Sequence, residues 1–100
     1  MILPSSKEPK RYVKFEIISE EKIFKEEADS SLYKKCLEFL GEEKFGQANI
    51  ICVNKDIIRV DADYKDELLF AVSLIRGINN KKAVFNTLKT SGNIKKTKRG

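Results

Sequence analysis

The chain has 100 residues, of which 41% are hydrophobic and 35% charged, and its formal net charge is +5. These values are typical of one small globular domain with a heavily charged surface, and they exclude a disordered chain. No apolar run approaches the ~20 residues of a membrane-spanning helix, and the N-terminus lacks the apolar stretch of a signal peptide. We therefore expect a cytoplasmic protein that does not associate with a membrane.

Six elements are predicted from the spacing at which apolar side chains recur along the chain. They are a strand at 11–18, a helix at 25–40, strands at 48–53 and 57–61, a helix between Asp63 and Gly77, and a strand at 82–89. The strands alternate or are β-branched, and the helices repeat apolar side chains every three or four residues. Gly41 and Gly77 are expected to end the helices, a polar loop is expected at 42–47, and Asp63 is expected to cap the second helix.

The order strand, helix, strand, strand, helix, strand is that of the ferredoxin-like fold. This is an α+β fold, in which two helices cover one face of a four-stranded antiparallel sheet. We expect this domain at 10–90, after an extended N-terminal arm at 1–9 and before a basic C-terminal tail at 91–100. In this topology the first and last strands are antiparallel neighbours, so the start of one lies beside the end of the other.

The sequence offers no evident set of catalytic residues. There is no histidine, which excludes Ser-His, Cys-His and His-metal chemistry. Cys36 and Cys52 form no C-x-x-C pair, and we interpret both as buried thiols. Two carboxylate pairs stand where helices are expected to start, which favours a capping role: Asp61 with Asp63, and Glu26 with Glu27. We expect no catalytic residue, no metal ligand and no cofactor bound by the polypeptide.

Basic side chains gather at the two ends of the chain. Residues 1–14 carry a net +3 and residues 89–100 a net +5 without any acid, whereas residues 15–88 hold 11 basic and 14 acidic side chains. Blocks of like charge usually mark contact with a polyanion, although solvated tails are an alternative. Since the fold brings both blocks together, the sequence favours a nucleic-acid contact.

We call this expected cluster the basic corner. It comprises Lys7, Lys10, Arg11, Lys14, Lys89, Lys95, Lys96, Lys98 and Arg99. Arg59, on the third strand, is a further candidate RNA contact, and Arg11, Arg59 and Arg99 suit bidentate phosphate binding. Such contacts give salt-sensitive affinity with little reading of sequence. Base stacking, as in the RNA recognition motif, is not expected, because the third strand has no aromatic residue and the first has only Tyr12 in a suitable position.

The face of the sheet away from the helices is called the open face below. It is expected to present apolar side chains among charged ones, namely Tyr12, Ile18, Ile57 and Phe85. An apolar patch rimmed by charge favours a protein interface. Scattered exposed hydrophobic residues without a partner are the alternative.

Three segments of the chain occur in the order found in a known family. They are Lys-Arg-Tyr-Val-Lys-Phe-Glu at 10–16 followed by Ser19-Glu20, Ile-Ile-Arg-Val at 57–60, and Thr87-Leu88 with Ser-Gly-Asn-Ile-Lys-Lys at 91–96. Together they resemble the archaeal ribonuclease P protein component 2 family, which is shared with a eukaryotic subunit of ribonucleases P and MRP. The chain departs from the family at Asp56, where the family tends to have glycine, and at Asn93, where it tends to have threonine.

The resemblance implies a non-catalytic subunit of ribonuclease P, the RNA-catalysed enzyme that removes the 5′ leader of precursor tRNA. It implies two direct partners, the ribonuclease P RNA and protein component 3, with precursor tRNA contacted indirectly. Magnesium is then expected at the active site of the RNA. The expected role of this chain is to bind and stabilise the catalytic RNA.

Other functions of the same fold remain as alternatives. The first is a stand-alone RNA- or ribosome-associated binding protein. A ligand-binding regulatory module would need glycine-rich loops or a polar pocket at a dimer edge, which the sequence does not indicate. An acylphosphatase-like enzyme would need Arg and Asn in a phosphate-binding loop, whereas the acidic Ser19-Glu20-Glu21 follows the first strand here.

Overall fold

The computed structural model describes residues 9–54 and 56–92. The elements are β1 (Lys10–Ile18), α1 (Lys25–Ala48), β2 (Ile51–Asn54), β3 (Ile57–Asp61), α2 (Lys65–Ser73), β4 (Gly77–Ile78), β5 (Lys81–Lys82) and β6 (Val84–Ser91). β1, α1, β2, β3, α2 and β6 follow the predicted order. The short strands β4 and β5 were not predicted.

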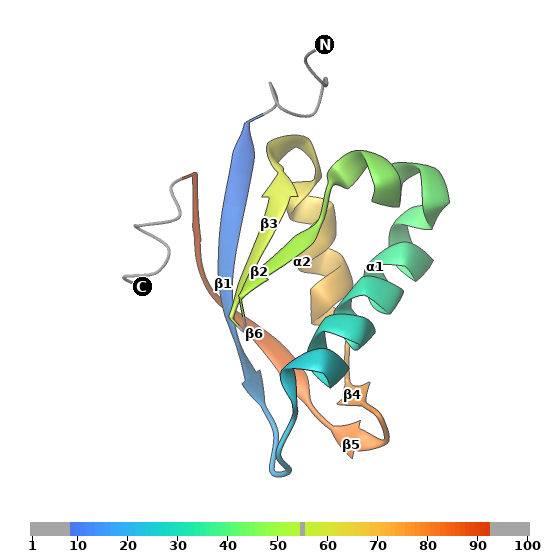
Figure 1. Ribbon diagram of the computed structural model, residues 1–100, viewed down its shortest axis with the longest axis vertical. Coiled ribbons are helices and arrows are strands. Elements are labelled where there is room, and N and C mark those ends of the chain that lie inside the picture. The colour runs from blue at the N-terminus through green and yellow to red at the C-terminus, as the bar shows by residue number, and fades with distance from the viewer. Residues whose placement is uncertain (1–8, 55, 93–100) are drawn as a thin grey trace.

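The four longer strands form one antiparallel sheet in the order β2-β3-β1-β6. Both helices lie on the same side of this sheet (Figure 1). This confirms the predicted ferredoxin-like fold, including the pairing of the first strand with the last. β4 and β5 form a separate two-stranded hairpin after α2.

The core lies between the sheet and the helices. Val13 and Phe15, two residues apart on β1, are buried there. Leu32 and Cys36 from α1 and Leu68 from α2 belong to the same cluster. Full burial of one large apolar side chain contributes about 1.5–3 kcal/mol. This cluster therefore fixes which face of the sheet the helices cover and which face stays open.

The first helix does not end at Gly41. Gly41 has φ 84° and ψ 163°, which breaks the helix locally, but the following residues return to helix and α1 continues to Ala48. The polar loop predicted at 42–47 is therefore wrong. Packing holds this second part of α1, because Ala48 is buried and the Phe45 ring lies edge-on to Tyr33, with 6.4 Å between ring centroids.

Replacing Gly41 by alanine should lower the free energy of unfolding by about 1–3 kcal/mol, because residues with a Cβ atom avoid this backbone region. No atom lies within 4 Å of the position that the Cβ would take, so the cost is conformational. Gly46 is the matched control, because it lies in the regular part of α1 with equally open space. Alanine there should raise the free energy of unfolding by about 0.5–1 kcal/mol. Urea denaturation measures both, and equal effects would contradict this account of Gly41.

The second helix begins and ends differently from the prediction. Asp63 lies inside a 3-10 helix, Ala62–Tyr64, and Tyr64 rather than Asp63 is the N-cap of α2. The predicted cap is wrong because the chain makes this tighter turn before the helix starts. α2 ends at Ser73, before Gly77, which instead begins β4.

The strand boundaries also shift. β2 starts three residues later than predicted, because α1 runs to Ala48 and Asn49 ends it in a left-handed conformation with φ 53°. β6 continues through Thr90 and Ser91, beyond the end that was predicted for the last strand at residue 89. This extension matters because it lengthens the pairing between β6 and the start of β1.

Candidate nucleic-acid interface

The start of β1 and the end of β6 lie side by side. Tyr12 stands opposite Ser91, and Lys14 stands opposite Lys89. Because Val13 points into the core, its neighbours on β1 point to the open face. Two lysines that are far apart in the sequence are thus brought together on that face, as the topology predicted.

A β-bulge in β6 sets this arrangement. Thr87 stands opposite Phe15, whereas Lys89 stands opposite Lys14, so two steps along β6 match one step along β1. The extra residue is Leu88, which is half exposed. A bulge reverses the face to which the following side chains point. Residues two apart on a strand normally share a face. Here Thr87 stands opposite the buried Phe15, whereas Lys89 lies on the open face.

Arg59 lies on the same face, on the other side of β1 from Lys89. It stands opposite Tyr12 of β1 and Ile51 of β2, so it occupies the middle of the sheet. Its Nε is buried and has no hydrogen-bond partner among the described residues. Leaving a buried donor unpaired costs about 1–3 kcal/mol. An acceptor from a bound molecule would offset that cost.

A partly buried polar network holds the start of β1. Lys10 Nζ forms an ion pair with Asp61, which is 4% exposed, and Asn49 Nδ2 donates to the same carboxylate at 2.9 Å. Arg11 Nη1 donates to the Lys10 carbonyl at 2.9 Å, and a Cβ on Gly92 would stand 3.4 Å from that nitrogen. The ion pair offsets the charge of Lys10, whereas the guanidinium of Arg11 lies against the end of β6.

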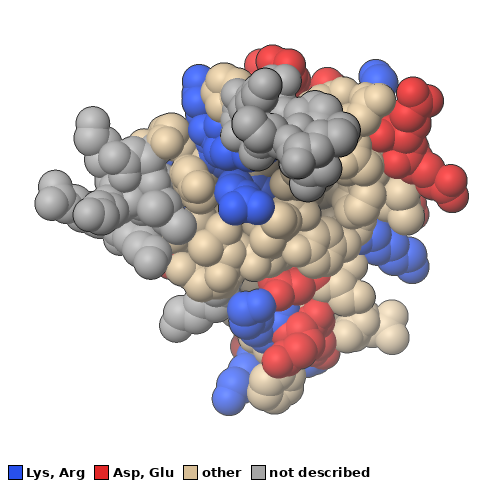
Figure 2. Space-filling model, turned by 45° about the horizontal axis from the view of Figure 1, so that its top comes forward, with Lys and Arg blue, Asp and Glu red and all other residues tan. Residues whose placement is uncertain are grey.

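Figure 2 shows Lys and Arg side chains running together as a blue strip near the top of that view, whereas Asp and Glu lie at its right-hand edge, at its top and, beside further Lys and Arg, at its bottom. The described members of the basic corner are Lys10, Arg11, Lys14 and Lys89. The other members lie outside the described residues: Lys7, Lys95, Lys96, Lys98 and Arg99. These described members of the basic corner come from the paired ends of β1 and β6, where Lys14 stands opposite Lys89.

Two of the four side chains predicted for a protein interface are not exposed on the open face. Phe85 stands opposite Ile17, and its ring packs against Phe15 with 5.1 Å between centroids, so it belongs to the core and is 8% exposed. Ile57 begins β3, which lies between β1 and β2, and it is 1% exposed. The predicted exposure is wrong for both, because strand register turns Phe85 into the core and Ile57 is almost fully buried at the start of β3.

Ile18 is exposed and Tyr12 is half-buried, so both remain candidate interface residues. The sequence prediction missed Ile51 and Val53, which are exposed because β2 forms an edge of the sheet. They alternate with Cys52, which packs against the core. This run was interpreted from the sequence only as a β-branched strand. The alternation around Cys52 indicates that Ile51 and Val53 point outward.

The helical layer also carries exposed aromatic side chains. Phe39 of α1 and Phe70 of α2 are 42% and 55% exposed, and their ring centroids lie 5.1 Å apart. Leu74, one turn after Phe70, is exposed as well. We call these three residues the Phe39–Phe70 patch. None of the three was among the side chains predicted for a protein interface.

The thiols do not form a reactive site. Burial raises the pKa of the Cys36 thiol to about 12 and that of the Cys52 thiol to about 11, so both are protonated near neutral pH. Cys36 is buried as predicted, whereas Cys52 is only partly buried.

Over the described residues, no group of three or more Asp, Glu, Cys or His side chains is placed to hold a metal ion. In the same part of the chain, no helix is long and apolar enough to span a membrane.

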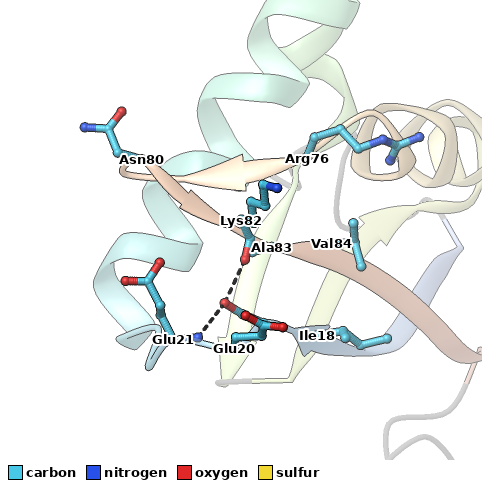
Figure 3. Close-up of a pocket in the computed structure, with 9 residues that line it drawn as sticks. Ile18, Glu20, Glu21, Arg76, Asn80, Lys82, Ala83 and Val84 are labelled. Atoms are coloured by element: carbon cyan, nitrogen blue, oxygen red, sulfur yellow. Dashed lines mark hydrogen bonds between the residues drawn. The ribbon is translucent and has the colours of Figure 1, made fainter.

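A groove of about 920 Å³ lies between the end of β1 and the β4–β5 hairpin (Figure 3). Ser19 Oγ donates to the Lys82 carbonyl at 2.8 Å and accepts from the Glu21 N–H at 3.2 Å, so this hydroxyl already makes structural bonds. Glu20 and Arg76 also line the groove, so its charge is of mixed sign. Its lining residues contain no nucleophile paired with a general base, and we assign no reaction to it.

Comparison with known proteins gives consistent relatives. The sequence profile of the Rpp14/Pop5 family matches residues 11–100. The chain is 33% identical over 102 residues to ribonuclease P protein component 2 of Pyrococcus furiosus, an alignment that covers 96% of this chain and 85% of that protein. It is 35% identical to ribonuclease P protein component 2 of Thermococcus gammatolerans, with the same coverage of both.

Proposed function

The chain belongs to the Rpp14/Pop5 family, and from this membership we propose that it is a protein subunit of ribonuclease P that binds the RNA of that enzyme. Ribonuclease P removes the 5′ leader of precursor tRNA. The observation that carries the RNA contact is the placement of Lys14 beside Lys89 on the open face, with Arg59 across β1. The names of the aligned relatives support the assignment to the complex.

The proposed contact works through phosphates. Lys14 and Lys89 are amines on flexible stems, which suit phosphate oxygens in many geometries, and Arg59 adds a planar donor group. The Nε of Arg59 is unsatisfied within the described residues. A shift of this side chain toward a phosphate would give that donor an acceptor.

We assign a positioning role to Lys10. Its ion pair with Asp61 links β1 to β3, and the bond from Asn49 adds the end of α1. These bonds fix the position of the first residue of β1, and therefore the positions of Arg11 and the strand residues that follow it. In this proposal Lys10 contributes less to RNA affinity than the other basic residues do, because Asp61 already offsets its charge.

Chemistry belongs to the RNA in this proposal. The described residues do not provide a fit for a magnesium ion, since no cluster of three suitable ligands occurs among them. We therefore derive no catalytic step through this chain. Its proposed contribution is electrostatic, because cations next to folded RNA offset the repulsion between phosphates.

A protein partner, protein component 3, is part of the proposal. We assign it to the Phe39–Phe70 patch rather than to the open face, because the open face, although it keeps Ile18, Ile51 and Val53 exposed, carries the proposed RNA contact. Several acidic residues lie on the neighbouring turns of the two helices: Glu42, Glu43, Asp66 and Glu67. Lys44 and Lys65 lie beside two of them, Glu67 and Asp66, so the apolar patch has a charged rim of both signs, which favours a protein interface.

Reconstitution with and without this subunit tests the proposal. The complex should reach half-maximal cleavage of precursor tRNA at a several-fold lower magnesium concentration when the subunit is present, because its cations replace part of the neutralising role of magnesium. The same magnesium requirement with and without the subunit would refute the proposed stabilisation. Failure of the subunit to bind ribonuclease P RNA, with retained binding to other RNA, would favour a stand-alone RNA-binding protein instead.

A further inference from the structure

A second groove lies on the other side of the molecule from the open face, between α1 and the segment that follows α2. It has a volume of about 610 Å³ and a mostly polar lining, which includes Ser30, Ser31, Lys34, Lys35, Arg76 and Asn80. We call it the polar groove. It adjoins the proposed partner surface, because Leu74 lines the groove and also belongs to the Phe39–Phe70 patch, but its polar and charged residues lie outside both that patch and the predicted basic corner.

The charge in the polar groove is mainly positive. Lys34, Lys35 and Arg76 line it, and the one acidic residue among its lining residues is Glu38. Glu38 lies 3.5 Å from Lys35 Nζ, so this acid is partly offset by its own neighbour. Lys34 and Arg76 are exposed. An anion that enters the groove therefore meets a net positive surface.

The partly buried Glu27, whose carboxylate contacts the groove-lining Asn79, does not reverse this balance. Glu27 accepts hydrogen bonds from the Phe24 N–H at 2.9 Å and from Asn79 at 3.1 Å, and it pairs with Lys81 at 3.3 Å. These donors lower the pKa of the Glu27 carboxyl, and the bond from the Phe24 N–H is the largest cause of this shift. The carboxylate is thus occupied by the start of α1 and the β4–β5 hairpin.

The donors around the groove are suited to phosphate oxygens. The hydroxyls of Ser30 and Ser31 and the side-chain amide of Asn80 lie among the cations. Arg76 is held in place, because its Nη1 donates to the Ser73 carbonyl at 2.6 Å. Neutral donors placed between flexible lysines and a fixed arginine are a common way to hold a nucleic-acid backbone without reading bases. An apolar peptide would find little to bury here.

The polar groove and the basic corner lie at opposite ends of the molecule. Figure 1 shows the start of β1 and the end of β6 at the top, whereas the β4–β5 hairpin and the start of α1 lie at the bottom. The groove opens on the helical layer and the corner on the sheet. One short RNA segment on the open face does not contact both, so two contacts require two segments of RNA.

We propose that the polar groove binds backbone phosphates of a second RNA segment, so that this chain bridges two parts of one RNA. The inference rests on the proposed function as an RNA-binding subunit. It adds a second site, on the opposite face, and a geometric role. A protein that touches two segments fixes the distance between them, which a protein with a single basic surface does not do.

The test compares a groove variant, Lys34→Gln with Lys35→Gln, with a control of equal charge change on the helical layer, Lys44→Gln with Lys65→Gln. The groove variant should bind ribonuclease P RNA about 3- to 10-fold more weakly at physiological salt. A plot of the logarithm of its association constant against the logarithm of salt concentration should be shallower by the amount expected for about one to two lost phosphate contacts. Hydroxyl-radical footprinting should show one protected RNA segment lost and another retained. The control should change neither measurement.

Each other result decides against the inference. If the groove variant binds and protects RNA like the unmodified chain, while substitutions of Lys14 and Lys89 weaken binding, the second site is refuted and the proposed function stands. If neither set of substitutions affects RNA binding, both are refuted. If the groove variant keeps both footprints but no longer assembles with a protein partner, the groove is a protein surface. Equal losses in the control would show an effect of net charge alone.

Discussion

Replacing Lys14, Arg59 and Lys89 together by glutamine should weaken binding of ribonuclease P RNA by about 10- to 100-fold at physiological salt, since each lost phosphate contact removes part of the counterion-release free energy. The three side chains share the open face of the sheet through their positions on β1, β3 and β6. Fluorescence anisotropy with labelled RNA measures the change, and circular dichroism checks that the variant is folded.

A matched control separates this surface from net charge. Lys44, Lys65 and Lys82 lie outside the basic corner, on α1, α2 and β5. Changing these three to glutamine removes the same charge and should alter RNA affinity by less than about 3-fold. An equal loss of affinity in both triple variants would mean that the open face has no special role.

Replacing Asp61 by alanine should lower the free energy of unfolding by about 3 kcal/mol, the largest stability effect that we expect for a single polar substitution. Asp61 is 4% exposed and accepts from both Lys10 and Asn49. Its removal leaves an ammonium group and an amide partly buried without this acceptor, and breaking a buried pair from one side is costly. Urea denaturation measures the loss.

A double-mutant cycle with Lys10→Ala tests the mechanism behind that loss. If the ion pair carries much of the effect, the double variant should be more stable than the sum of the two single losses implies. Additive losses, or a loss below about 1 kcal/mol for Asp61→Ala, would show that the network contributes little. In that case another cause would have to explain how the start of β1 is fixed.

The faces of β1 were predictable from the sequence, whereas those of β6 were not. Val13 and Phe15 alternate with polar residues, and β1 lies between two strands, so the period of two fixes its orientation. β6 contains the bulge at Leu88, and alternation fails across an extra residue. Phe85 was therefore assigned to the wrong face, although Lys89 was correctly expected next to β1.

The kink in α1 shows a similar limit of local signals. Gly41 does interrupt the helix, as its sequence position indicated, but a single residue at positive φ is compatible with a helix that resumes. Whether it resumes depends on tertiary packing, here the contact of Phe45 with Tyr33. Local propensity does not contain that information.

The β4–β5 hairpin was missed because two-residue strands show no alternation. Its signal was the pair Asn79-Asn80, which adopts positive φ at both residues between Ile78 and Lys81. Asparagine is favoured in two-residue turns of this kind. The omission mattered for function, because this hairpin supplies part of the polar groove and the partners of Glu27.

The salt dependence of RNA binding tests the central claim most directly, which is that Lys14, Arg59 and Lys89 contact phosphates of ribonuclease P RNA. The logarithm of the association constant is plotted against the logarithm of salt concentration for the unmodified chain and for the triple glutamine variant. We predict a slope that is shallower by about two to three in the variant, because each phosphate contact contributes about 0.7–0.9. Two parallel lines would contradict the claim, since they would mean that these three side chains release no counterions when the RNA binds.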